Sequence, residues 1–329
     1  MMGDRSEPSH SIRSATSSPP SPALALREFE RAAAESPADS RLWQAALIAL
    51  MRGRVSDFDI GSGMAMGAAR PLRVAVVTPY FREDAATLHR CHASVLAQTY
   101  PCRHIMVADG QARPEVSGWE VDHVCLPRPN ADYGDTPRVI GGERAVALGC
   151  DAIAYLDADN AYRPHHVESL VYRHGATSAP VVYSGRTMHF PDGQLLPVTD
   201  PEDGRTHIDT SCLFLVGPAL AMCSAWLAYP RPLAIIDDRL FVRMLRARGL
   251  DFAFTGALTL RYTVHYAALY RTQKLPVPSD ARPALDLTPA LAYCRGLSTA
   301  QWRELEAAVG FPLEGFVRSL AERSAQWPE

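Results

Sequence analysis

Short apolar runs alternate with amphipathic stretches through the middle of the chain. The first runs that predict buried strands are residues 73–77, 104–108, 121–126 and 153–156. After Asp84, apolar residues recur at helical spacing, and a second helix is predicted over 143–148. Strands and helices that alternate in this way predict an α/β fold, with a mostly parallel sheet flanked by helices.

The pattern continues beyond residue 160 with a helix that opens at Pro164. Further strands are predicted over 181–190, 212–216 and 252–262. Asp237 or Asp238 can cap a helix that runs through Leu245. The sheet therefore extends well into the second half of the chain.

Composition divides the chain into four parts. Residues 1–22 are rich in Ser and Pro and predict a disordered leader, and 23–70 predict a small helical appendage followed by a linker. The α/β domain is expected over 71–275. Residues 276–329 predict a helical extension, in which Ser298-x-x-Gln301 is a capping-box pattern.

Composition and charge narrow the class of protein. The 329 residues are 47% hydrophobic and carry a net charge of −3, so no basic field favours nucleic acid. Seven scattered cysteines without a C-x-x-C pair indicate a reducing, cytoplasmic compartment. No signal peptide is evident. Residues 210–230 have the length of a membrane span, but Gly217-Pro218 interrupts them. A strand followed by a helix explains the same residues. Peripheral membrane association stays open.

The strongest candidate chemistry follows the strand at 153–156. This strand delivers Asp157 and Asp159 to its carboxyl end, where an open α/β sheet usually binds its ligand. Two carboxylates one residue apart can share a hard cation such as Mg²⁺ or Mn²⁺, which keeps positions for substrate phosphates. The alternative is a solvated turn, since turns are rich in Asp and Asn.

Six segments in order resemble the inverting family 2 glycosyltransferases, which have the GT-A fold. They are Val-Val-Thr-Pro-Tyr (76–80), Ser-Val-Leu-Ala-Gln-Thr-Tyr-Pro (94–101), Val-Ala-Asp-Gly (107–110), Ala-Tyr-Leu-Asp-Ala-Asp-Asn (154–160), Asp-Asp-Arg-Leu-Phe-Val-Arg (237–243) and Leu-Arg-Tyr-Thr-Val-His (260–265). The resemblance implies a GT-A type of α/β fold over 71–275.

The resemblance also implies roles at the nucleotide end of the site. Thr78, Pro79 and Tyr80 would line the nucleobase and ribose, and Asp109 would accept a hydrogen bond from the base. The family normally shows two acids in a row, whereas this chain has Ala108 before Asp109, so the identity of the base stays open. The alternative for Asp109 is a turn residue before a glycine.

Basic residues could contact the diphosphate or the cation. Arg138 or Arg144 could bind phosphate oxygens. Only one of the 33 basic residues is a lysine, so arginine is common throughout the chain. For each arginine, a solvated surface position is therefore nearly as good an explanation. His265 matches a histidine that approaches the metal or the diphosphate in related enzymes, and its alternative is a structural hydrogen bond. His207 and Asp209 could face the acceptor.

The implied reaction moves a sugar from a nucleotide-diphosphate donor to a hydroxyl acceptor with inversion. A divalent cation, Mn²⁺ or Mg²⁺, would be held at the diphosphate by Asp157, Asp159 and His265. A carboxylate must accept the proton of the acceptor hydroxyl, and Asp237 and Asp238 are the candidates. If positions are counted back from Arg243, the catalytic acid of the family falls on Asp237. If the acidic pair is taken as a unit, it falls on Asp238. For both residues the alternative is that they cap the helix.

Rival interpretations remain. A sugar-nucleotide nucleotidyltransferase should carry a Gly-rich, Arg- and Lys-containing loop after its first strand, which residues 78–84 lack. A haloacid-dehalogenase-like phosphatase would place its Asp-x-Asp after the first strand. A non-catalytic nucleotide- or glycan-binding scaffold is the third alternative. For a glycosyltransferase in polysaccharide biosynthesis, the acceptor could be a glycan, a lipid-linked glycan or a protein.

Overall fold

A computed structural model describes residues 70–196, 207–279, 281–283 and 285–325. The predicted leader, 1–22, and the predicted appendage and linker, 23–70, lie outside these described residues except for Arg70. The described residues thus comprise most of the predicted α/β domain and of the C-terminal extension.

The described residues form an eight-stranded sheet in the order β3-β2-β1-β4-β7-β6-β8-β5. Strands β3, β2, β1 and β4 are parallel neighbours, β7 is antiparallel to both β4 and β6, and β8 runs parallel to β6. The bounds are β1 Val74–Tyr80, β2 Cys102–Ala108, β3 Asp122–Cys125, β4 Ala152–Tyr155, β5 Ala161–Tyr162, β6 Val181–His189, β7 Leu213–Val216 and β8 Phe252–Thr263.

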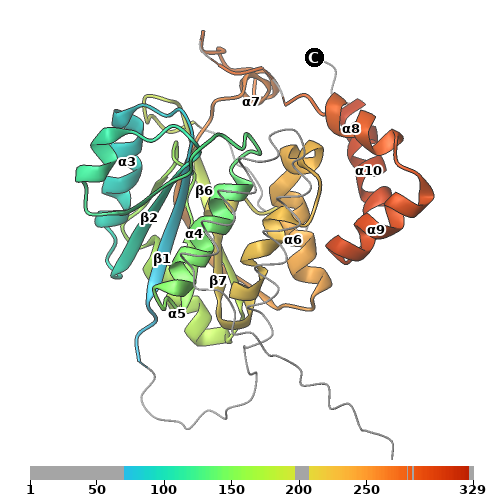
Figure 1. The fold of residues 1–329 in the computed structure, drawn as a ribbon. Helices are drawn as coiled ribbons and strands as arrows, with labels where there is room; N and C mark the ends of the chain where they lie inside the picture. Colours follow the sequence, from blue (N-terminus) through green and yellow to red (C-terminus); the bar gives the residue numbers. More distant parts are fainter. Residues whose placement is uncertain (1–69, 197–206, 280, 284, 326–329) are drawn as a thin grey trace, which may run out of the picture. The chain divides into compact units, whose positions relative to one another are not determined.

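Helices flank the sheet (Figure 1). The connection from β1 to β2, which contains α3, and the connection from β3 to β4, which contains α4, run in opposite directions along the sheet. Since such connections are right-handed, α3 and α4 lie on opposite faces. The helices of the domain are α3 Ala85–Leu96, α4 Asp135–Ala147, α5 His166–Thr177, α6 Asp237–Ala247 and α7 Ala267–Thr272, with 3-10 helices η1 Pro114–Gly118, η2 Thr210–Cys212, η3 Gly217–Leu227 and η4 Arg231–Ile236. The C-terminal helices are α8 Thr288–Arg295, α9 Thr299–Val309 and α10 Leu313–Ala325.

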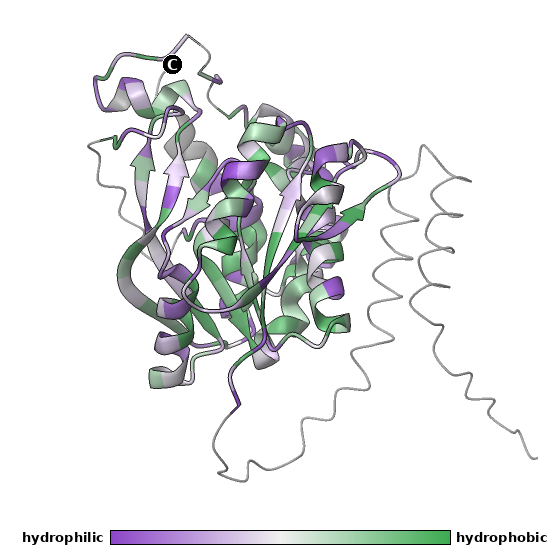
Figure 2. Ribbon diagram, turned by 90° about the vertical axis from the view of Figure 1, so that its left-hand side faces the viewer, coloured by the Kyte–Doolittle hydropathy of each residue, from purple (hydrophilic) through white to green (hydrophobic). Residues whose placement is uncertain are grey.

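The core lies along the central parallel strands. Every residue of β1 and of β4 is buried, as expected for strands covered on both faces. Figure 2 shows hydrophobic colouring along the strands in the interior. Helix α4 packs closely on β1, since a Cβ atom placed on Gly141 would come within 2.4 Å of Val77 Cγ1. This close approach fixes the helix that carries Arg138 against the strand that ends at Tyr80.

The predicted fold class, an α/β fold with a mostly parallel sheet flanked by helices, is confirmed, as is the helical C-terminal tail. Some element boundaries were wrong. The helix predicted over 143–148 begins earlier, at Asp135, and the strand predicted over 121–126 is only Asp122–Cys125. The helix predicted after Val216 is a 3-10 helix, which begins with Gly217-Pro218. Among the described helices, none has the length and apolar composition needed to cross a membrane.

Candidate active site

A cleft of ≈ 370 Å³ opens beside the carboxyl ends of β1, β2 and β4. These strands are parallel neighbours; β1 and β2 end opposite each other, at Tyr80 and Ala108, while β4 ends at Tyr155, opposite Val77 of β1. The chain order reverses between β1 and β4, and ligands of open α/β sheets bind at such a point. The predicted site residues that line this cleft are Pro79, Tyr80, Asp109, Arg138, Asp157, Asp159 and His265.

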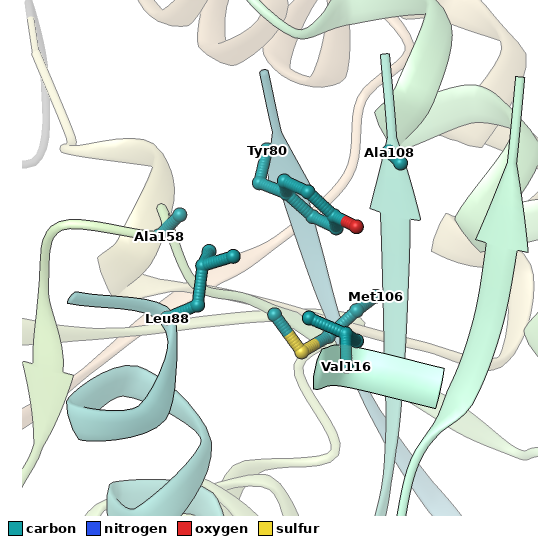
Figure 3. Close-up of a cluster of buried hydrophobic side chains, with 6 residues drawn as sticks. All are labelled: Tyr80, Leu88, Met106, Ala108, Val116 and Ala158. Atoms are coloured by element: carbon teal, nitrogen blue, oxygen red, sulfur yellow. The ribbon is translucent and has the colours of Figure 1, made fainter. Parts of the chain in front are cut away.

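A small apolar cluster (Figure 3) adjoins this cleft, since two of its members, Tyr80 and Ala158, also line it. Its members are Tyr80, Leu88, Met106, Ala108, Val116 and Ala158. Ala158 packs into the cluster at 4% exposure, and its two neighbours, Asp157 and Asp159, line the cleft. Residues 157–160 form a turn, in which Asn160 N donates to Asp157 O at 3.0 Å, and this turn brings both carboxylates to the cleft.

Arg138 joins carboxylates that are far apart in the sequence. Its Nη2 donates to Asp157 Oδ1 and its Nη1 to Asp237 Oδ2, each at 2.8 Å, while Asp135 Oδ1 lies 3.6 Å from Nη1. The guanidinium stacks over the Trp226 ring, 4.9 Å from its centroid. Burial opposes the positive charge, but the carboxylates outweigh it and raise the pKa of Arg138 above its usual value. The arginine is therefore a permanent buried cation between two parts of the site.

Asp159 faces His265 across the cleft. Asp159 Oδ2 lies 3.4 Å from His265 Nε2, and both side chains are about one-quarter exposed. The loop of Asp159 is fixed to the strand that precedes His265, because Thr263 donates from its hydroxyl to Asp159 O and from its N–H to Asn160 Oδ1. Burial, with nearby Asp157 and Glu83, raises the pKa of Asp159 to about 7.

The donor atoms at Asp159 and His265 fit part of a divalent-cation site. A carboxylate oxygen and an imidazole nitrogen are both ligands that Mn²⁺ accepts, and phosphate oxygens and water usually supply the remaining positions. No group of three His, Cys, Asp or Glu side chains that could hold a metal occurs within the described residues. Asp157 instead contacts Arg138. Among the described residues, Asp159 and His265 thus offer two donors for a cation shared with a ligand.

The carboxylate of Asp109 holds a neighbouring loop. Its Oδ1 accepts the N–H and the side-chain amide of Asn130 at 2.9 and 2.7 Å, and its Oδ2 accepts the N–H of Ala131 at 3.1 Å. Thr78, predicted beside the nucleobase, is fully buried, and its hydroxyl lies 2.9 Å from His104 Nε2. Asp109 therefore lines the cleft with its carboxylate already hydrogen-bonded, and Thr78 does not line it.

The two candidate bases have different partners. Asp237 Oδ2 accepts from Arg138, whereas Asp238 Oδ2 lies 2.6 Å from His207 Nε2. Burial raises the pKa of Asp237 to about 7, although Arg138 opposes the shift. Burial also acts on Asp238, but the neighbouring His207 outweighs it and lowers the pKa. Neither acid caps α6, whose N-cap is Ile236; both lie in its first turn, where the helix dipole favours negative charge.

Other candidates lie away from the cleft. Arg144 forms a 2.9 Å ion pair with Asp122 and its side chain is 47% exposed. Asp209 pairs with the buried Arg186 and caps the short helix that precedes β7. The structure therefore brings Arg138 to the cleft and leaves Arg144 on the surface.

The sequence reasoning missed several residues that line the cleft: Glu83, Tyr133, Tyr266 and Arg282. The segment around Arg282 is joined to the site through its backbone, since Arg282 N donates to His265 O at 2.6 Å and Ala267 N donates to Arg282 O at 2.8 Å. One signal was available. Tyr266 directly follows His265, so an aromatic residue at the cleft could have been inferred from that position.

Comparisons with known proteins give partial likenesses. No family model matches the sequence. A stretch of 103 residues, 29% of this chain, is 28% identical to the succinoglycan biosynthesis protein ExoW of Rhizobium meliloti (strain 1021) and spans 32% of that protein. The match thus covers about a third of the curated relative.

Among solved structures, S. aureus TarS 1–349 in complex with UDP aligns over 72% of this chain and 81% of its own, with 12% identity and a TM-score of 0.47. A second structure of S. aureus TarS aligns over 72% of this chain and 48% of its own, with 11% identity and a TM-score of 0.44.

Proposed function

We propose that this chain is a glycosyltransferase that transfers a sugar from a nucleoside-diphosphate donor to a hydroxyl acceptor, with inversion at the anomeric carbon. The observation that carries the proposal is the Arg138 bridge, which brings Asp157 beside the strand ends and Asp237 on α6 to one guanidinium. Arg138, Asp157, Asp159 and His265 line the cleft, whereas Asp237 does not line it and is joined to it through Arg138. The sequence likeness to a succinoglycan biosynthesis protein supports a polysaccharide as the product.

In this proposal the donor diphosphate binds near Asp159, His265 and Arg282. A divalent cation held by Asp159 and His265 would neutralise the charge that develops on the departing diphosphate. Arg282, which also lines the cleft, supplies a positive charge for phosphate oxygens. Tyr80 belongs to the apolar cluster and also lines the part of the cleft next to Asp109, where the base would lie.

Asp237 is the proposed general base. The acceptor oxygen forms a bond to the anomeric carbon as the bond from that carbon to the diphosphate oxygen breaks, and the hydroxyl proton passes to the carboxylate. A base is most effective when its pKa lies near the working pH, and burial raises that of Asp237 to about 7. Asp238 has a lowered pKa and is turned to His207, so it holds the neighbouring loop in this account.

The proposal is tested by separating nucleotide binding from turnover. Thermal unfolding is measured with UDP or GDP, each with and without Mn²⁺, and a panel of nucleotide sugars is screened for hydrolysis. A ligand that binds the native state raises the unfolding temperature by mass action. We expect a metal-dependent rise in the wild type, its loss in Asp159→Ala, and its retention in Asp237→Asn together with loss of turnover.

Two results would contradict this function. Normal sugar transfer by both Asp159→Ala and Asp237→Asn would remove the assigned roles. A metal-dependent nucleotide shift without turnover of any nucleotide sugar would favour the alternative of a nucleotide-binding scaffold. Asp122→Asn is a matched control, since Asp122 contacts Arg144 on the surface and lies outside the cleft.

A further inference from the structure

The loop that follows β3 has an unusual backbone next to the cleft. Ala131 and Tyr133 have φ values of 51° and 56°, and Gly134 has a φ of 95°. Left-handed backbone is unfavourable for alanine and tyrosine, and it persists only where surrounding interactions enforce it. Two such residues within three positions indicate that the loop is held in a specific shape.

Buried polar groups hold this shape from beneath. Asp109 accepts three hydrogen bonds from Asn130 and Ala131, as described above. Asp132, 4% exposed, accepts from the N–H and the hydroxyl of Thr136 at 3.1 and 2.5 Å. Arg138 Nη1 donates to the carbonyl of Tyr133 at 3.1 Å. The loop is thus anchored at both ends and at its centre.

This anchored loop presents Tyr133 to the cleft. The side chain lines the cleft and yet is 56% exposed, so it contributes little to the packed core. Partial burial, with Tyr266 and Asp237 nearby, raises the pKa of its hydroxyl. An anchored, strained loop that exposes a large aromatic ring is a costly arrangement for folding alone, and such strain gathers at binding sites.

The position of Tyr133 indicates the side of the site that it serves. Its carbonyl and Asp237 Oδ2 both accept from Arg138 Nη1, so Tyr133 and the proposed base share one nitrogen. The proposed cation ligand Asp159 has a different partner, His265. The Tyr133 side chain also lines the cleft and has its hydroxyl close enough to Asp237 for the two to interact electrostatically, so we place the ring on the side where the attacking hydroxyl would lie.

We propose that Tyr133 is a specificity-determining platform on which the apolar face of a pyranose ring of the acceptor stacks. This inference rests on the proposed function. One face of a pyranose presents C–H groups and its rim presents hydroxyls, so an aromatic surface can bury the C–H groups while the hydroxyls stay available to polar groups. The sugar of the donor has the same chemistry, and the experiment separates the two sources.

The test compares three variants with the wild type. Tyr133→Asn removes the ring but suits a left-handed backbone, Tyr133→Phe keeps the ring without the hydroxyl, and Tyr172→Asn removes a 78% exposed tyrosine that does not line the cleft. Donor hydrolysis is measured without acceptor, using the nucleotide sugar that the wild type turns over. Transfer is measured with p-nitrophenyl glycosides as acceptor probes. Thermal unfolding checks that each variant folds.

We expect Tyr133→Asn to raise the acceptor KM roughly tenfold. This fold increase should be at least about three times the fold increase in the donor KM for hydrolysis. Tyr133→Phe should restore the acceptor KM, and Tyr172→Asn should match the wild type. An unchanged acceptor KM in Tyr133→Asn overturns the proposal, and a rise confined to the donor KM assigns the ring to the donor sugar instead. If the wild type turns over no nucleotide sugar, the proposed function fails and this inference fails with it.

Discussion

Replacing Arg138 by Met should destabilise the protein more than any surface charge change. The guanidinium is 5% exposed and makes two 2.8 Å ion pairs, with Asp157 and Asp237. Met keeps an apolar stem over the Trp226 ring but leaves both carboxylates without their cation. Removing one partner of a buried ion pair costs about 3–5 kcal/mol, because the remaining charge stays in a poorly solvated place. We expect a loss in the free energy of unfolding within this range at pH 7.

The size of this loss should depend on pH. The pKa of Asp237 is raised from 3.8 to about 7 in the folded wild type, so the folded state holds this proton below pH 7 and the associated stability is lost as the pH rises through 7. Without Arg138 the pKa of Asp237 rises further above 7. Between pH 7 and this higher pKa, the variant still loses stability as the pH rises, whereas the wild type has already released the proton. The gap should therefore widen above pH 7, by up to about 1.4 kcal/mol per pH unit.

Urea unfolding at pH 6 and pH 8 measures both effects. Tryptophan fluorescence, to which Trp226 beside the guanidinium contributes, reports the transition. Arg144→Met is the matched control, because its pair with Asp122 is surface-exposed and should change stability by less than about 1 kcal/mol. The reasoning is refuted if Arg138→Met costs no more than Arg144→Met, or if its cost is the same at both pH values.

Two further changes test the packing of the domain and the chemistry of the cleft. Gly141→Ala should destabilise by about 1–3 kcal/mol in urea unfolding because its Cβ meets Val77 Cγ1 at 2.4 Å, whereas Gly175→Ala, with open space around it in α5, should stabilise by about 0.5–1 kcal/mol. Equal stability of these two variants contradicts the packing argument. Arg282→Gln should weaken UDP binding in the presence of Mn²⁺ roughly tenfold by calorimetry. The exposed Arg271→Gln is its control, and equal weakening in both speaks against a phosphate contact.

The sequence was sufficient to predict the parallel half of the sheet and the edge where the site lies. Continuous apolar runs identify strands buried on both faces, and such strands end together at one edge. Asp109 directly follows β2, and Asp157 and Asp159 come within four residues of the end of β4, so local pattern was enough to place them near one another. His265 follows β8 in the same way and does reach the cleft.

The partners of these residues could not be predicted from pattern. The carboxylate of Asp109 is taken up by the Asn130–Ala131 loop, and nothing in the local sequence shows that this loop folds back onto it. Arg138 and Arg144 lie six positions apart on one helix in an arginine-rich chain, so their spacing cannot show which one faces the cleft. That choice follows from the packing of α4 against β1 and η3, a tertiary property.

The geometry of Arg138 explains how two acids with different tasks can lie so close together. A guanidinium is planar and presents its N–H groups in fixed directions, so carboxylates bound to Nη1 and Nη2 are held apart at a set spacing. Asp237 occupies one nitrogen and Asp157 the other. Their mutual repulsion is offset by the cation between them, and each carboxylate keeps a second oxygen. In Asp237 that oxygen accepts the N–H of Asp238, which fixes the orientation of the side chain at the start of α6. A proton taken up by Asp237 would weaken its bond to Arg138 and leave Asp157 as the stronger partner of the arginine. In the proposed reaction, proton transfer on the acceptor side would thereby be coupled to charge on the donor side.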